Sequence, residues 1–161
     1  MSFDARTFRN ALGCFPTGVT IVTTTAGDSS PLGVTINSFC SVSLDPPLVL
    51  FCLDNKNTCL DAFKAAGRFA INVLCREQRE LSIRFASRLE GKWKDVPYET
   101  WAGGAPILSG CLANFDCTTV DIRDGGDHQI FIGRVERLRC AQDGEPLVYY
   151  RGSYADLRDE D

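Results

Sequence analysis

The sequence predicts a mainly β fold, an antiparallel barrel with α-helices packed on its outside. Alternating and apolar runs indicate about seven short strands and three helices. The helices do not alternate regularly with the strands, which argues against a doubly wound parallel sheet. Neither G-x-G-x-x-G nor G-x-x-x-x-G-K-[ST] occurs, so the usual dinucleotide and nucleoside-triphosphate loops are absent. At 161 residues, the chain is most simply one domain, 1–161.

Apolar periodicity and turn residues place the elements along the chain. Helices are predicted at 4–12, 58–67 and 76–88. Strands are predicted at 19–23, 32–37, 48–53, 69–73, 112–122, 129–139 and 147–150. The segment 89–110 is rich in Gly and Pro and is expected to be a loop, and the acidic tail 156–161 is expected to fray.

Capping and facing residues support the three helices. Asp4 can cap the first helix. Thr58 and Asp61 resemble a capping box at the start of the second. In the third helix, Leu81 and Phe85 share one face, which is therefore expected to turn inward.

Two of the predicted strands have distinctive faces. At 32–37, Gly33, Thr35 and Asn37 share a small, polar face that would let a flat ligand approach the backbone closely. The run Leu48–Leu53 is apolar throughout and predicts a strand buried on both faces. At 19–23, Val19, Ile21 and Thr23 alternate with Thr20 and Val22, a pattern that indicates a strand.

Charge and hydropathy exclude several classes of partner. The formal net charge is −4, so no basic field favours nucleic acid or an acidic membrane surface. The longest apolar run, Leu48–Leu53, is too short to span a bilayer. The N-terminal residues contain no apolar signal segment, and we expect a cytoplasmic protein.

Eight cysteines are present, at positions 14, 40, 52, 59, 75, 111, 117 and 140. No pair has C-x-x-C spacing, and the single histidine is His128, so no metal site is predicted. A cytosolic context argues against structural disulfides. We expect most of these cysteines to be small buried hydrophobes, with one or two exposed.

Polar side chains gather between two strands and at the end of the second one. The first group is Thr35, Asn37, Ser38, Ser41 and Ser43, and the second is Asp54-Asn55-Lys56-Asn57. Neutral donors beside one lysine suit a small phosphorylated ligand with a polar ring. The same residue types are common in turns, and a lone lysine is often a solvated surface residue. The residues alone leave both interpretations open.

Two further features are ambiguous. His128 begins a predicted strand after Gly-Gly-Asp, where it could cap a turn or orient an amide or phosphate. No Ser-His-Asp or Cys-His spacing accompanies it, so a hydrolytic triad is not supported. Tyr149, Tyr150 and Tyr154 surround Arg151-Gly152, where they could stack on a ring system or serve as core and rim residues.

Six segments, taken in order, support a family resemblance. They are FPTGVT (15–20), GVTINSF (33–39), SVSLDPPL (41–48), FAINVL (69–74), GDHQIFIGRV (126–135) and PLVYYRGSY (146–154). With these segments the chain resembles the flavin reductase-like family, the small reductase components of two-component flavin-dependent monooxygenases. The resemblance runs nearly from end to end.

The resemblance implies a split β-barrel of the FMN-binding type, Greek-key-like, and a homodimer with flavin near the subunit interface. It implies that FMN, or FAD, is reduced by NADH or NADPH. It also implies that the reduced flavin leaves for a separate oxygenase component.

The resemblance also implies roles for individual residues. The isoalloxazine edge would be lined by Thr35, Asn37 and Ser38. The ribityl and phosphate groups would be held by Ser41, Cys52, Asn55, Lys56 and Asn57. The phosphate end would be approached by Ala86, Ser87 and Lys92. The neighbouring cofactor-binding residues would be Ile36, Leu53 and Thr58. The nicotinamide nucleotide would be contacted by His128, taken as the catalytic residue, and Tyr154.

Three other functions remain as alternatives. The same barrel could carry, store or sense flavin without reducing it, because fold does not dictate function. It could belong to a flavoenzyme that acts on its own bound organic substrate. A small β-barrel interaction module would bind no flavin at all.

Overall fold

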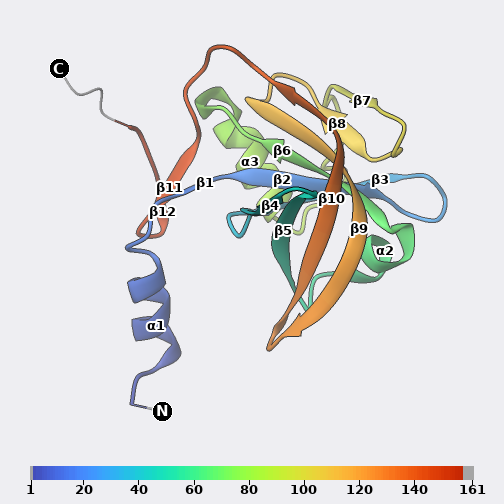
Figure 1. The fold of residues 1–161 in the computed structure, drawn as a ribbon. Coiled ribbons are helices and arrows are strands. Elements are labelled where there is room, and N and C mark those ends of the chain that lie inside the picture. The colour runs from blue at the N-terminus through green and yellow to red at the C-terminus, as the bar shows by residue number, and fades with distance from the viewer. Residues whose placement is uncertain (1, 158–161) are drawn as a thin grey trace.

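A seven-stranded antiparallel sheet forms the body of the molecule and coils into a barrel, as Figure 1 shows. The computed structural model describes residues 2–157; residues 158–161, part of the tail expected to fray, lie outside this range. The strand order is β3-β2-β6-β9-β10-β5-β4. The strands are β2 Thr20–Thr25, β3 Pro31–Ile36, β4 Cys40–Leu44, β5 Pro47–Asp54, β6 Arg68–Val73, β9 Ala113–Gly125 and β10 His128–Cys140. The predicted mainly β, antiparallel barrel is confirmed.

Two smaller sheets accompany the barrel. One has the order β1-β11-β12, from strands Thr17–Gly18, Val148–Tyr150 and Ser153–Ala155. The other pairs β7, Tyr98–Thr100, with β8, Pro106–Leu108. The prediction that 89–110 is entirely loop is therefore wrong. Strands of two or three residues show no periodicity of their own, which is why β1, β7, β8 and β12 were not predicted.

The helices are α1 Ala5–Leu12, α2 Leu60–Ala66 and α3 Arg79–Ala86, the last preceded by a 3-10 turn at Arg76–Gln78. Asp4 caps α1 as predicted, with Oδ1 accepting from the Thr7 N–H at 2.7 Å. The capping box predicted from Thr58 is wrong. Instead, Asn57 Oδ1 accepts the Cys59 N–H at 2.9 Å, and the helix begins at Leu60.

Strands β5 and β2 are buried in different ways, and the prediction that β5 is buried on both faces is wrong. In β5, Val49, Phe51 and Leu53 are buried while the residues between them are half-buried, so this strand alternates after all. In β2, by contrast, Thr20–Thr24 are all buried. The reason is position: β2 lies between β3 and β6 in the sheet and also contacts α2, α3 and β8.

Phenylalanine rings fill the centre of the barrel. Phe51 and Phe131 stack with centroids 4.8 Å apart, and Phe63 and Phe69 meet Phe51 edge to face. All four side chains are at most 1% exposed. This packed core fixes the positions of β5 and β10. The polar residues Asp54–Asn57 lie at the end of β5, and His128 begins β10.

The cysteines are less buried than expected. All eight are free thiols; only Cys111 and Cys117 are buried, whereas Cys14, Cys40 and Cys140 are exposed. Burial raises the pKa of Cys111 to about 11 and that of Cys117 to about 12, so both thiols stay protonated at neutral pH. Within residues 2–157, no helix is long and apolar enough to cross a membrane.

Candidate active site

Strand β3 runs beside two cavities. The larger, about 460 Å³, lies along its first part, Pro31–Val34. The smaller, about 190 Å³, lies along Thr35–Asn37, at the end of the strand. Ala86, the last residue of α3, lines both cavities. A ligand lying along β3 could therefore occupy both.

Helix α3 closes over β3 because Gly33 leaves room for an aromatic ring. A Cβ at Gly33 would lie 2.7 Å from Phe85, which is 1% exposed, and Trp93 meets Phe85 edge-on at 4.9 Å. The sequence predicted that a flat ligand approaches the backbone at Gly33, but the Phe85 ring occupies that position. Further along the strand, Thr35 Oγ1 donates to the Ser82 carbonyl at 2.7 Å and ties α3 to β3.

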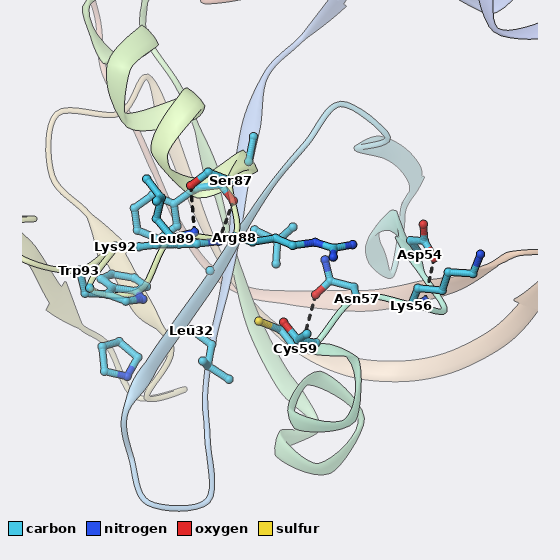
Figure 2. A pocket seen from close by; sticks show the side chains of 17 residues that line it. Leu32, Asp54, Lys56, Asn57, Cys59, Ser87, Arg88, Leu89, Lys92 and Trp93 are labelled. Atoms are coloured by element: carbon cyan, nitrogen blue, oxygen red, sulfur yellow. Dashed lines mark hydrogen bonds between the residues drawn. The ribbon is translucent and has the colours of Figure 1, made fainter. Parts of the chain in front are cut away.

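The larger cavity is cationic. Its wall contains three cationic side chains, Lys56, Arg88 and Lys92, against one carboxylate, Asp54. In Figure 2, Arg88 extends across the cavity toward Asn57, while Lys56 and Asp54 lie at the far end. The Asn57 N–H₂ has no hydrogen-bond partner among residues 2–157. Cations and such an amide donor suit a phosphate group. The residues present therefore fit the phosphate of a nucleotide.

Six of the residues predicted to bind cofactor line this larger cavity: Lys56, Asn57, Thr58, Ala86, Ser87 and Lys92. The Ser87 hydroxyl is already engaged, because it donates to the Arg84 carbonyl at 2.7 Å and accepts from the Leu89 N–H at 3.3 Å. Its side chain shapes the loop after α3. Arg88, the last residue of the helix predicted at 76–88, was interpreted as one of several solvated cations that could reach a phosphate. Trp93 was not predicted, because it follows the helix in a segment without periodicity.

The smaller cavity has the character of a slot for a polar ring. Five predicted residues line it: Thr35, Ile36, Asn37, Ala86 and Tyr154. Among residues 2–157 the Asn37 side chain has no hydrogen-bond partner, so its amide can serve a ligand. Tyr149, one of the tyrosines that could stack on a ring system, also lines this cavity. Val19 and Ser82 complete the wall and were not predicted. Uncharged donors beside apolar surface suit a flat heteroaromatic ring.

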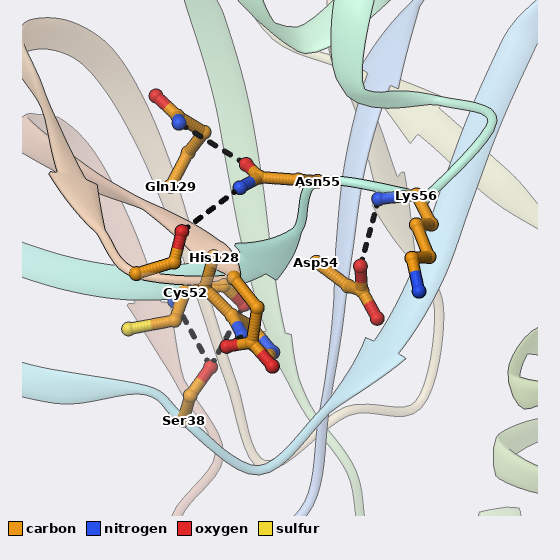
Figure 3. Close-up of polar contacts among 9 residues, drawn as sticks. Ser38, Cys52, Asp54, Asn55, Lys56, His128 and Gln129 are labelled. Carbon is orange, nitrogen blue, oxygen red and sulfur yellow. Dashed lines mark hydrogen bonds and ion pairs between the residues drawn. The ribbon is translucent and has the colours of Figure 1, made fainter.

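Several predicted residues lie outside both cavities in the described part of the chain. Ser38 Oγ donates to the Cys52 carbonyl at 3.1 Å and accepts the Cys52 N–H at 3.0 Å, which joins the two segments (Figure 3). Leu53 is a core residue, 2% exposed. Ser41 lies on the edge strand β4. Burial raises the pKa of the Cys52 thiol, so it is protonated at neutral pH.

His128 is held by its neighbour Asp127. The Nδ1 atom lies 2.7 Å from Asp127 Oδ1, which leaves Nε2 available. This hydrogen bond, together with the nearby charges of His128 and Lys56, lowers the pKa of Asp127. His128 lines neither cavity, but it pairs across the sheet with Asp54, which lines the larger one.

The turn that carries His128 is fastened to the end of β5. The Asn55 N–H donates to the Asp127 carbonyl at 2.9 Å, and its side-chain Nδ2 donates to the Gly126 carbonyl at 3.1 Å. Gln129 Nε2 in turn donates to Asn55 Oδ1 at 3.1 Å, as Figure 3 shows. The Asn55 amide therefore positions the turn, and its contact with the ribityl and phosphate groups stays a prediction.

Comparison with known proteins gives one consistent result. Residues 12–158 match the family model described as "Flavin reductase like domain". The chain is 42% identical, over 98% of its length and 84% of the relative's, to "Flavin-dependent monooxygenase, reductase subunit HsaB" of Mycobacterium tuberculosis. It is 45% identical, over 94% of its length and 85% of the relative's, to "FMN reductase (NADH) SmoA" of Agrobacterium fabrum.

A solved structure is similar as well. The Streptomyces globisporus NADH:FAD oxidoreductase SgcE6, in complex with NAD and FAD fragments, superposes with a TM-score of 0.91 at 33% identity. The match covers 96% of this chain and 93% of that one. The barrel fold is thus shared with a 33% identical protein whose structure contains NAD and FAD fragments.

Proposed function

This chain belongs to the flavin reductase-like family, and we propose that it acts as the reductase component of a two-component monooxygenase. In this role it transfers hydride from NADH to a flavin and supplies the reduced flavin to a separate oxygenase. Relatives named as a monooxygenase reductase subunit and as an FMN reductase (NADH) support both parts of the proposal.

The observation that supports the proposal best is the pair of cavities along β3. A flavin mononucleotide combines a neutral, hydrogen-bonding ring with a phosphate. The smaller cavity offers Asn37 and the Tyr154 hydroxyl to a ring, and the larger cavity offers Lys56, Arg88 and Lys92 to a phosphate. The strand between them joins the two kinds of binding surface.

The chemistry of hydride transfer belongs to the two nucleotides, the flavin accepting the hydride when it is bound. The chain's own residues bind and orient. The Asn37 amide donates to the ring edge, where negative charge develops on reduction. Asp127 holds His128 so that Nε2 is free to contact the nicotinamide nucleotide. No residue is required to act as a general base.

The choice of flavin is part of this proposal. We propose FMN, with FAD as the alternative: the 45% identical relative is named an FMN reductase, and the 33% identical solved relative is named an NADH:FAD oxidoreductase. Steady-state assays with each flavin, and with NADH and NADPH in turn, would rank the substrates by kcat/KM. A higher kcat/KM with FAD would reverse the assignment.

A homodimer is also proposed. Helix α1 has no buried residue, and Phe8, Leu12 and Phe15 are 52%, 59% and 75% exposed. A helix this short is marginal in water without packing. A second copy of the chain that covers this surface would stabilise α1.

The test of function is NADH oxidation in air, followed by absorbance, with and without added FMN. We expect oxidation that rises and saturates with FMN, since the flavin behaves as a substrate. Measurable FMN binding without oxidation of NADH or NADPH would support a flavin carrier or a flavoenzyme with another electron donor. Absence of flavin binding would point to an interaction module.

A further inference from the structure

The smaller cavity contains a buried polar side chain to which the proposed function gives no role. Ser82, on α3, is 0% exposed, and it contributes to the cavity wall beside Thr35, Asn37 and Tyr154. A buried hydroxyl without a hydrogen bond is destabilising, so the partner of Ser82 decides what this residue does.

The protons of two hydroxyls can be assigned from their surroundings. Ser82 Oγ lies 2.8 Å from the Tyr154 hydroxyl oxygen, and either atom could donate. Within residues 2–157, that oxygen is the only hydrogen-bond partner of Ser82 Oγ. If Tyr154 donated, the Ser82 proton would be buried without an acceptor. Ser82 therefore donates, and the Tyr154 proton is left for the cavity.

The Tyr154 ring is also held in place. The Tyr149 ring meets it edge to face with centroids 5.5 Å apart, and the Arg79 guanidinium carbon lies 5.2 Å from its centroid. Ser82 itself is fixed, because its carbonyl accepts from Thr35 Oγ1 at 2.7 Å. The hydroxyl of Tyr154 is thus pre-positioned rather than free to rotate out of the cavity.

We propose that Ser82 is a positioning residue. It directs the Tyr154 hydroxyl proton to a carbonyl oxygen on the heteroaromatic group bound in the smaller cavity, either in the ring itself or in a carboxamide attached to it. This proposal rests on the proposed function. At about 190 Å³, the cavity is below the roughly 300–1,000 Å³ of sites that enclose a whole drug-sized ligand, so only part of a nucleotide enters. The nicotinamide carboxamide and the isoalloxazine ring both carry such a carbonyl oxygen.

Two titrations distinguish these sources without any turnover: FMN binding to the protein alone, and NAD⁺ binding to the FMN-loaded protein. Tyr154→Phe is expected to weaken one of the two by about threefold to tenfold, the value of one hydrogen bond. Weaker FMN binding identifies the isoalloxazine as the acceptor of the Tyr154 hydrogen bond. Weaker NAD⁺ binding identifies the carboxamide as the acceptor. Tyr150→Phe, which alters a neighbouring tyrosine on the same small sheet, is the control and should change neither.

Thermal unfolding separates positioning from simple packing. Tyr154→Phe should lower Tm, because it leaves the buried Ser82 hydroxyl without a partner. The double variant Tyr154→Phe with Ser82→Ala should regain the Tm of the wild type but not its affinity for the ligand. Ser82→Ala alone should weaken the same ligand, by a smaller factor, because Tyr154 keeps its proton but loses its orientation.

Two results would overturn the proposal. The first is wild-type affinity for both ligands in Tyr154→Phe, a variant that retains the ring and tests the donor even if Ser82→Ala fails to fold. The second is an effect of Ser82→Ala that persists unchanged in the Tyr154→Phe background. Because binding is measured without turnover, absence of NADH oxidation by the wild type would contradict the proposed function separately.

Discussion

Lys56 is the cation of the larger cavity that the sequence singles out. Replacing it by alanine should raise the Kd for FMN by about threefold to tenfold, since one charge-assisted contact to phosphate is lost. The difference should shrink as salt rises, because salt screens exposed charges. Fluorescence titration of FMN at low and high salt measures both effects. Lys64→Ala, an exposed lysine on α2, is the matched control; an equal loss in both variants would remove Lys56 from the site.

His128 is expected to serve the nicotinamide nucleotide. His128→Ala should raise the KM for NADH while the Kd for FMN stays unchanged, because the side chain lines neither flavin cavity. Steady-state kinetics and FMN titration measure the two quantities. An unchanged KM for NADH together with undiminished turnover would exclude this role.

The single histidine gives a direct spectroscopic test of its partner. Nitrogen-15 NMR of the imidazole should show the proton on Nδ1, facing Asp127. Because the pKa of Asp127 is lowered, its carboxylate holds this contact at neutral pH and loses it only as pH falls through that lowered pKa. Asp127→Asn should shift the tautomer population toward Nε2–H. An identical spectrum in the variant would contradict the pairing.

Among the elements, the packing of α3 on β3 shapes both cavities. Gly33→Ala would place a Cβ 2.7 Å from the Phe85 ring, so we expect a loss of about 1–3 kcal/mol in unfolding free energy. Chemical denaturation measures it. Gly27→Ala, where a Cβ meets nothing within 4 Å, should be nearly neutral. Equal stability of the two variants would mean that α3 can move away from β3 at little cost.

Much of the fold was predictable from the sequence because long elements carry a repeating pattern. The strands from β2 to β10 with six or more residues, and all three helices, were predicted close to their observed bounds. The five-residue β4 and the short strands β1, β7, β8 and β12 were not, since a pattern that short cannot be distinguished from a turn, whereas the three-residue β11 lies within the strand predicted at 147–150. The predicted start of α2 was wrong because Asn57 Oδ1, and not the Thr58 side chain, accepts a backbone N–H before the helix, that of Cys59.

The candidate site was predictable where its residues are contiguous in the chain. Thr35–Asn37 and Lys56–Thr58 each line a cavity, and their contacts with a cofactor stay predictions. Ser82 was not found, because its role comes from contact with Thr35 and with Tyr154, 47 and 72 residues away. A serine inside an amphipathic helix gives no sign in the sequence that tertiary packing has placed it in a binding site.

At the scale of the whole molecule, the exposed apolar residues of α1 predict self-association. Sedimentation of the purified protein should show a dimer, and Phe8→Ser with Leu12→Ser should shift it toward monomer by removing apolar surface from the interface. Leu138→Ser, at an equally exposed apolar position near the end of β10, is the control. A monomeric wild type at micromolar concentration would exclude the dimer.

Ala86 has a consequence for the order of events in the cell. One small residue forms part of the wall of both cavities. If the nicotinamide carboxamide is the group that enters the smaller cavity, it rests against the same residue as the flavin phosphate in the larger cavity. If occupancy of either cavity changes affinity in the other, thermodynamic reciprocity requires the same factor in both directions. Departure of the oxidised nicotinamide nucleotide would then change the Kd of the reduced flavin. The factor would equal the one by which reduced flavin changes the Kd of that nucleotide. Release of the oxidised nicotinamide nucleotide would then control when the reduced flavin is released to the oxygenase.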